Sequence, residues 1–165
     1  MTFKVDEWVV HPRHGVGRIV EIEDHQFDSR PLQPYYQISI ENGTMWVGVD
    51  DSSSGLRGLT DKDELSKYRQ VLKSRPEALT EDHRQRQVDL SDRLREGSFQ
   101  ARCELVRDLS ALGWNKPLGE AVAAISRVAR QVLCEEWAMV EGTSQREALR
   151  EVDHLLKEGK SEYKE

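Results

Sequence analysis

The pattern of apolar residues changes once along this chain, close to Thr60. Before that point, short apolar runs alternate with clusters of turn-forming residues, which is typical of antiparallel strands. After it, leucine, valine and alanine recur every three or four residues, which is typical of amphipathic helices. The sequence therefore predicts an α+β protein, in which a small N-terminal β-barrel at 1–59 precedes an all-α domain of about five helices at 60–160.

The first domain is expected to contain strands near 7–11, 16–26, 35–41 and 44–49. Its clearest local signal is Asn42-Gly43 between "YYQISI" and "MWVGV", because Asn-Gly supplies the positive φ angles that a type I′ hairpin turn needs. Ile38 and Ile40 alternate with polar residues, which predicts one buried and one solvated face. A sheet of four or five such strands is expected to close into the barrel.

The helices of the second domain are expected near 61–74, 81–97, 98–112, 118–133 and 144–156. The fourth carries an unbroken stripe of apolar residues three and four positions apart, so it is the expected spine of the domain. Ser144 and Glu147 form a capping box for the last helix. Beyond Lys157 the polar sequence "EGKSEYKE" is expected to fray, and residues 161–165 are assigned to a tail.

The segment "VVHPRHGVGRIVEIE" at residues 9–23 places two histidines and an arginine around a proline and a glycine. A metal site is not expected there, because no cysteine or carboxylate at ligand spacing completes a set within the same β unit. Pro12 fixes φ and removes a backbone donor, while Gly15 and Gly17 permit a tight corner or a bulge. We interpret the segment as a corner between two strands.

Enzymatic function is not expected. The chain lacks a G-x-S-x-G motif, a phosphate loop and the glycine pattern of a dinucleotide-binding fold, and we expect no cofactor. Cys103 and Cys134 lie in helical patterns and are most simply buried free thiols. A nucleophile pair of Cys103 and His83 on adjacent helices, as in a thiol-dependent hydrolase, is the weaker alternative.

The formal net charge of -6 argues against nucleic-acid binding through bulk electrostatics, so any DNA contact must be local or recruited by a partner. No run approaches the ~20 apolar residues of a membrane helix, and the N-terminus lacks the residue order of a signal peptide. We therefore expect a cytoplasmic protein that does not enter the membrane, and we expect a monomer.

Three stretches carry a resemblance to a known family: "FKVDEWVVHPRHGVGRIVEIE", then "YYQISI", then "GLRGL". Together they resemble, over residues 3–59, the N-terminal module of the CarD/CdnL family of bacterial transcription regulators, a module shared with the transcription-repair coupling factor. "LREGS" and "ELVRDL" are similar to the C-terminal domain of the same family. The resemblance implies a Tudor-like barrel that docks on the β subunit of RNA polymerase by adding strand edge to strand edge.

The resemblance also implies roles for individual residues. The expected polymerase-binding residues are His25, Tyr36 and Trp46; His25 and Trp46 stand where some relatives carry arginines. Trp46 either anchors the interface or packs in the barrel. Arg57 is interpreted as a structural donor that ties the barrel to the helices. The motif residues Pro12, His14, Gly15 and Gly17 are expected to shape the corner.

The DNA contact implied by the resemblance departs from the family pattern. CdnL-type members carry a tryptophan at the start of the helix before Gly97, which wedges into the minor groove beside the opening bubble. Counting back from Gly97 places His83 there, followed by the basic residues Arg84 and Arg86. Phosphate contact is expected to remain, whereas an apolar wedge does not follow. Trp114 is a possible substitute wedge, and Trp137 is most simply core.

The sequence therefore predicts a transcription regulator that binds the polymerase β subunit through its first domain. It is expected to contact promoter DNA weakly and locally through its second domain, and thereby to modulate the stability of the open promoter complex. The alternative is a polymerase-tethered adaptor without a productive DNA wedge, favoured by the acidic balance and the missing tryptophan.

Overall fold

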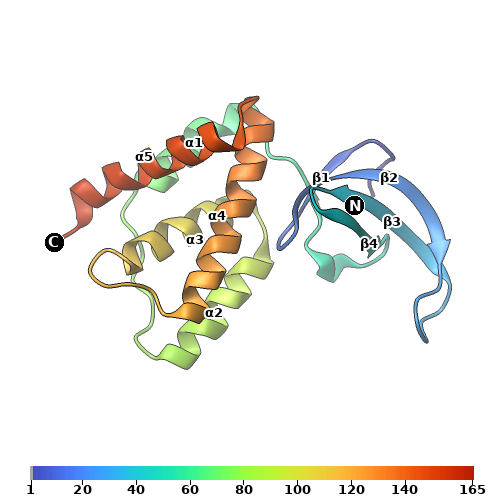
Figure 1. The fold of residues 1–165 in the computed structure, drawn as a ribbon, viewed down its shortest axis with the longest axis horizontal. Helices are drawn as coiled ribbons and strands as arrows, with labels where there is room; N and C mark the ends of the chain where they lie inside the picture. Colours follow the sequence, from blue (N-terminus) through green and yellow to red (C-terminus); the bar gives the residue numbers. More distant parts are fainter. Residues whose placement is uncertain (1) are drawn as a thin grey trace.

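The computed structural model describes residues 2–165, which form a β-sheet followed by a helical domain (Figure 1). The strands are β1 (Trp8–His11), β2 (Gly15–His25), β3 (Gln33–Ile40), β4 (Gly43–Gly48) and β5 (Arg57–Gly58). The helices are α1 (Leu65–Lys73), α2 (His83–Glu96), α3 (Phe99–Leu112), α4 (Glu120–Glu141) and α5 (Gln145–Tyr163). The predicted α+β class and the five helices are confirmed.

The sheet is antiparallel and open, with the strand order β4-β3-β2-β1-β5. A hairpin is present at the predicted place, since Ile40 pairs with Gly43 across the β3–β4 turn, which leaves Glu41 and Asn42 as the turn residues. The expected type I′ turn is wrong, because Asn42 does not have the positive φ angle that such a turn needs. The expected closed barrel is wrong: among residues 2–165 no ladder joins β4 to β5, and β5 has only two residues. So short a strand offers too few backbone groups to continue the sheet around to β4.

One face of the sheet holds the core of the first domain. Its buried members are Phe3, Val9, Ile19, Tyr36, Ile38 and Val47. Ile38 is fully buried and Ile40 packs against the cluster, so the predicted alternation is confirmed. The register of β2 against β3 shifts between Ile19 and Glu21, which is where the sheet carries its irregularity.

The helical domain packs around α4, which contacts α2, α3, α5 and also strand β2. Leu133 and Trp137 of α4 are fully buried, and Trp137 is core as expected. Ser98, Asp82 and Ser144 cap their helices through side-chain oxygens, and Gly97 ends α2 with φ 81°.

The last helix is longer than expected, because α5 continues to Tyr163 rather than fraying beyond Lys157. Two contacts with the end of α1 and the residues after it explain this. Gly159 lies so close to the backbone of Lys73 that an added Cβ would be 3.1 Å from the carbonyl oxygen. The guanidinium of Arg75 lies over the Tyr163 ring, 4.8 Å from its centroid. These contacts are not visible in a periodicity pattern.

The corner between β1 and β2 forms part of the junction between the two domains. Gly15 has φ 79°, and His11 Nδ1 accepts hydrogen bonds from the backbone N–H groups of Arg13 and His14. The exposed His14 ring lies 4.8 Å from the His11 ring. Gly17 lies within strand β2, and the Ile38 side chain occupies the space that a Cβ at Gly17 would need. Gly17 is therefore needed for close packing rather than for the turn.

The corner contacts the helices through two hydrogen bonds. Arg102 Nη2 on α3 donates to the Pro12 carbonyl oxygen at 2.9 Å, and the Val16 N–H donates to Glu135 Oε2 on α4 at 3.2 Å. Burial, and then the nearby Arg57 charge, lower the pKa of Arg102 to about 10. The residue still carries its charge at neutral pH, so its hydrogen bond to Pro12 is charge-assisted.

Arg57 on β5 makes a bidentate, charge-assisted contact between the domains. Its Nη1 and Nη2 donate to the two carboxylate oxygens of Glu136 on α4, each at 2.7 Å, and its Nε donates to the Gly97 carbonyl oxygen at 2.7 Å. Glu136 is 1% exposed and also accepts from the Thr60 N–H at 3.0 Å. This is the geometry of a structural donor that joins the sheet to the helices.

Substituting Gly15 should destabilise the protein because of this junction. An added Cβ would lie 2.0 Å from Glu135 Oε2, and φ 79° strains any residue with a side chain. We expect Gly15→Ala to lower the free energy of unfolding by about 1–3 kcal/mol in a denaturant titration. The matched control is Gly58→Ala, because nothing lies within 4 Å of the Cβ added there. Equal stabilities of the two variants would contradict the assigned role of Gly15.

Candidate protein and nucleic-acid interfaces

The outer edge of β4 is a candidate protein-binding surface. β4 ends the sheet order, so among residues 2–165 its second edge has no strand partner. Unpaired backbone N–H and C=O groups on such an edge can pair with a strand of another chain. Trp46 lies on β4 and is 45% exposed, so the alternative that it packs within the sheet core is wrong.

An aromatic cluster extends from Trp46 across the end of the sheet. The Phe27 ring lies 6.1 Å from Trp46, 4.8 Å from Tyr35 and 5.5 Å from His25, with the His25 ring stacked on it. The structure thus brings together two of the predicted contact residues, His25 and Trp46, through Phe27. Sequence reasoning missed Phe27, because it lies in the β2–β3 loop outside any alternating pattern.

Tyr36 does not belong to this surface, which corrects the sequence-based assignment. It is 2% exposed, and its hydroxyl accepts a hydrogen bond from the Phe3 N–H at 2.9 Å in the sheet core. Successive strand residues face opposite sides, so Tyr35 points to the aromatic cluster and Tyr36 away from it. The alternation was visible in "YYQISI" and could have excluded Tyr36.

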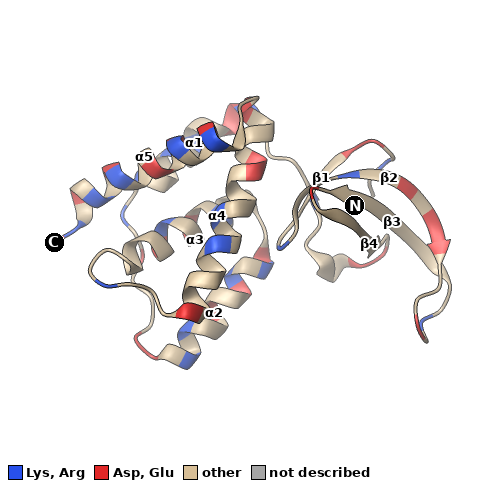
Figure 2. Ribbon diagram, in the orientation of Figure 1, with Lys and Arg blue, Asp and Glu red and all other residues tan. Residues whose placement is uncertain are grey.

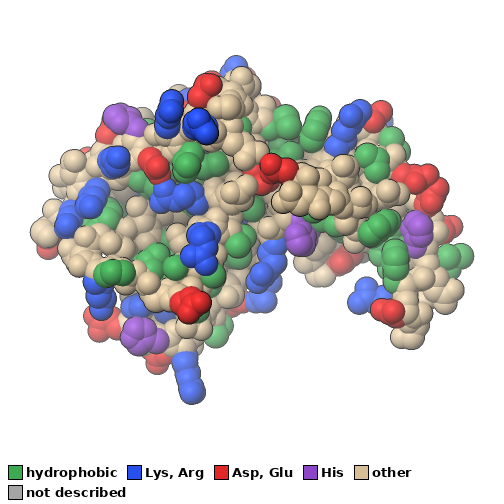
Figure 3. All heavy atoms as spheres, in the orientation of Figure 1, with side chains coloured by type: hydrophobic (Ala, Val, Ile, Leu, Met, Phe, Trp, Pro, Cys, Tyr) green, Lys and Arg blue, Asp and Glu red, His purple; other side chains and the backbone are tan. Residues whose placement is uncertain are grey.

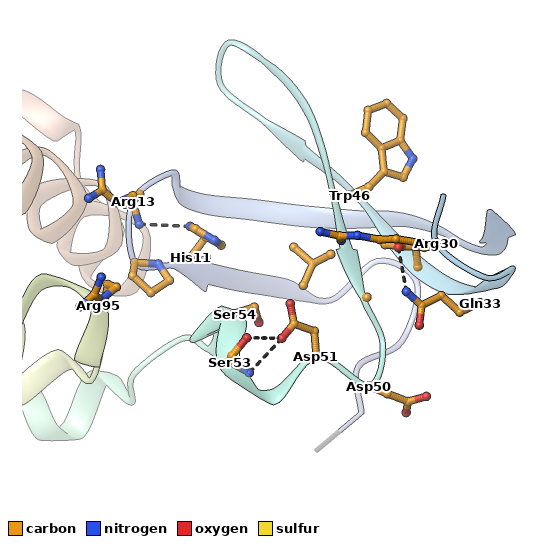
Figure 4. A pocket seen from close by; sticks show the side chains of 14 residues that line it. His11, Arg13, Arg30, Gln33, Trp46, Asp50, Asp51, Ser53, Ser54 and Arg95 are labelled. Carbon is orange, nitrogen blue, oxygen red and sulfur yellow. Dashed lines mark hydrogen bonds between the residues drawn. The ribbon is translucent and has the colours of Figure 1, made fainter. Parts of the chain in front are cut away.

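A cleft of about 660 Å³ separates this face of the sheet from the end of α2 (Figure 4). In the view of Figure 4, His11, Arg13 and Arg95 lie at one end of the cleft, and Trp46, Arg30 and Gln33 at the other. Burial, followed by the charges of His14, Arg13 and Arg102, lowers the pKa of His11 to about 4. The imidazole is therefore neutral at neutral pH, which suits its role as a hydrogen-bond acceptor in the corner.

The same face of the sheet is not basic. Glu21 and Glu23 on β2 lie opposite Gln37 and Tyr35 of β3, and the neighbouring Glu23 side chain is the main cause of the raised pKa of Glu21. Figure 2 shows acidic residues along the distal part of β2. Where relatives are expected to present arginines, this chain presents His25 and Trp46, so an interface here would depend on aromatic area and backbone groups.

The start of α2 is the candidate DNA contact. His83 and Arg84 are exposed in the first turn, and Arg86 is partly buried with its Nε donating to the Thr80 carbonyl oxygen at 2.9 Å. The Asp82 carboxylate caps the helix by accepting from the N–H groups of Arg84 and Gln85. Two of the backbone donors of this turn are therefore already used, and phosphate binding would depend mainly on the side chains.

A hollow of about 300 Å³ adjoins these residues, between the start of α2 and the loop that precedes α4. His83 and Arg86 line it together with Lys116 and the apolar residues Leu118 and Val122. Lys116 adds a cation that sequence reasoning missed, because the loop position carries no periodic signal. Figure 3 shows Lys and Arg side chains distributed over the helical half of the molecule and intermixed with acidic ones.

The geometry does not support the thiol-hydrolase alternative. Cys103 is fully buried in the helical core, and its burial raises the pKa of the thiol well above its usual range. Cys134 is also buried, which raises its thiol pKa to about 11. His83, the expected base, lies in the exposed first turn of α2. A reactive cysteine needs the opposite environment, one that stabilises the thiolate.

Within residues 2–165, no group of three or more histidine, cysteine or carboxylate side chains could hold a metal ion. No helix in this described part is long and apolar enough to cross a bilayer.

Comparison with known proteins gives matches along both domains. Residues 3–59 match the family model described as "CarD-like/TRCF RID domain", and residues 67–153 match the model "CarD, C-terminal domain". A relative from Bacillus subtilis (strain 168), named "Putative transcription factor YdeB", is 26% identical over 148 residues, which cover 88% of this chain and 96% of the relative. Both the order and the extent of the two matched regions agree with the sheet and the helical domain.

Proposed function

This chain belongs to the CarD family of transcription regulators, and we propose that it acts by joining RNA polymerase to promoter DNA. In this proposal the β4 edge binds the polymerase β subunit, and the start of α2 contacts DNA upstream of the opening bubble. The observation that carries it is the β4 edge, which has no strand partner within residues 2–165 and presents the exposed Trp46 beside the aromatic cluster. Arg57 holds this sheet against the helices.

Docking on the β4 edge would combine two kinds of contact. Backbone hydrogen bonds to a partner strand give affinity with little demand on side-chain identity. Trp46 supplies a large aromatic surface, and tryptophan is enriched among the residues that dominate interface energetics. Because Glu21 and Glu23 lie on this face, the partner surface is proposed to be neutral or basic rather than acidic.

The DNA contact is proposed to be weak and dependent on salt. Arg84 and Arg86 can each neutralise a phosphate, but Arg86 also holds the Thr80 carbonyl. His83 is smaller and more polar than tryptophan, so it offsets little of the few kcal/mol needed to unstack a base step. The protein would therefore modulate the open complex through position and charge rather than through an apolar wedge.

A second function remains a candidate, that of a polymerase-tethered adaptor without productive DNA contact. The formal net charge of -6 and the Asp82 carboxylate beside Arg84 favour it, because both oppose an approaching phosphate. The two functions differ in a single property, namely whether the start of α2 affects the open complex.

The first test concerns the polymerase contact. We expect Trp46→Ala to weaken binding of the full-length protein to the polymerase β subunit about 30-fold, the equivalent of a roughly 2 kcal/mol hot spot. The matched control is Trp8→Ala, since Trp8 is 42% exposed but lies on β1, which β2 and β3 separate from β4. Affinities measured by biolayer interferometry would decide this. Wild-type affinity of Trp46→Ala, or an equal loss in both variants, would refute the β4 assignment.

The second test concerns DNA. Restoring the family residue with His83→Trp should lengthen the lifetime of an open promoter complex formed with this protein's own polymerase. Arg84→Ala combined with Arg86→Ala should shorten it relative to wild type, because two phosphate contacts are lost. The matched control removes two exposed arginines of α5, Arg146→Ala with Arg150→Ala. If lifetimes are the same with all of these proteins, the adaptor function is correct.

A further inference from the structure

A second cavity in the helical domain has the composition of a nucleic-acid site and lies apart from the start of α2. It has a volume of about 320 Å³ and is bounded by the end of α3, by α4 and by α5. Trp114 lines it from the loop after α3, and Arg130, Lys157 and Lys160 line it from the two helices. An aromatic ring therefore shares a hollow with three cationic side chains.

Two of these cations are available for a ligand. Arg130 forms an ion pair with Asp153, which also lines the cavity, so its charge is compensated. Lys157 and Lys160 are exposed, and within residues 2–165 neither forms an ion pair. They lie three residues apart on α5, so they share one face of the helix. The cavity thus carries two free positive charges beside a partly buried indole.

The position of the cavity links it to the proposed DNA contact. The loop between α3 and α4 contributes Trp114 to this cavity and Lys116 to the hollow that holds His83 and Arg86. The two sites therefore share one short loop. Figure 2 shows basic residues both in this loop and along α5 toward the C-terminus. A strand that follows the start of α2 could continue across the loop to α5.

We propose that Trp114, Lys157 and Lys160 bind an unpaired segment of DNA, with a base stacked on the indole and phosphates beside the lysines. Stacking on an aromatic ring within a basic groove is the general mode by which proteins bind single strands. Duplex DNA fits less well, because its bases are already stacked and a single indole in a hollow cannot reach their faces. The inference rests on the proposed DNA-binding function and extends it to a strand of the opened bubble.

The experiment measures binding of the full-length protein to labelled DNA by fluorescence anisotropy over a range of salt concentrations. The two probes are a promoter fragment with an unpaired bubble and the same sequence fully paired. Trp114→Ala should weaken binding to the bubble at least fivefold, the equivalent of roughly 1 kcal/mol of stacking, and Trp114→Phe should lose less. Binding to the paired probe should change little with either variant.

The salt dependence of binding tests whether Lys157 and Lys160 contact phosphates. Lys157→Gln with Lys160→Gln should reduce the slope of log K against log salt for the bubble by about 1.4, because each phosphate contact on a single strand contributes roughly 0.7. The matched control, Lys4→Gln with Lys67→Gln, makes the same change in net charge at exposed lysines elsewhere. If both double variants have the same slope, or if the paired probe loses as much affinity as the bubble, the inference is overturned.

The outcomes separate this inference from the function on which it rests. If Trp114→Ala and the lysine variant bind the bubble like wild type while Arg84→Ala with Arg86→Ala does not, the α2 contact stands and this site is refuted. If only the Trp114 and lysine variants lose binding, this site stands and the α2 assignment is refuted. Absence of DNA binding by the wild-type protein would overturn both.

Discussion

The ion pair between Arg57 and Glu136 is the interaction on which the arrangement of the two domains depends. Glu136 is 1% exposed, and a carboxylate so deeply buried is costly unless its charge is compensated. Arg57 compensates it with two hydrogen bonds and uses its remaining Nε to bind the end of α2 through the Gly97 carbonyl oxygen. Sheet, α2 and α4 therefore meet at one guanidinium, and removing Arg57 would leave the buried Glu136 carboxylate without a compensating charge.

This junction holds the β4 edge and the start of α2, the two candidate surfaces, in a fixed relative orientation. In the proposed function, a weak DNA contact at the start of α2 would have little effect on its own, but attachment of the sheet to polymerase would raise its effective concentration at the promoter. This gain in effective concentration requires that the helical domain be held in one orientation relative to the sheet. The corner at Gly15, the hydrogen bond from Arg102 to Pro12 and the one from Val16 to Glu135 support the same orientation from a second position.

Local features of the fold could be predicted from the sequence, whereas contacts between distant residues could not. Asn42-Gly43 indicated the place of the hairpin, although not its turn type, and Ser98 and Ser144 marked helix starts, because each acts on its near neighbours. The open sheet and the full length of α5 depend on tertiary contacts. The family resemblance indicated Arg57 as a tie between domains, but its partner lies 79 residues away. Glu136 follows the apolar stripe of α4 and has no sequence signal of burial. The aromatic cluster was missed for the same reason, since Phe27 joins His25 to Trp46 only in the folded sheet.

The most direct test of the account is the open-complex lifetime with Arg57→Lys, a variant that retains the charge but cannot make the two parallel hydrogen bonds to Glu136. The account predicts that this variant binds the polymerase β subunit and DNA separately as wild type does. This variant should nevertheless affect the lifetime of the open promoter complex less than the wild-type protein does, because the helices are no longer held in one orientation relative to the sheet. A lifetime equal to that with the wild-type protein, with both separate affinities unchanged, would contradict the account.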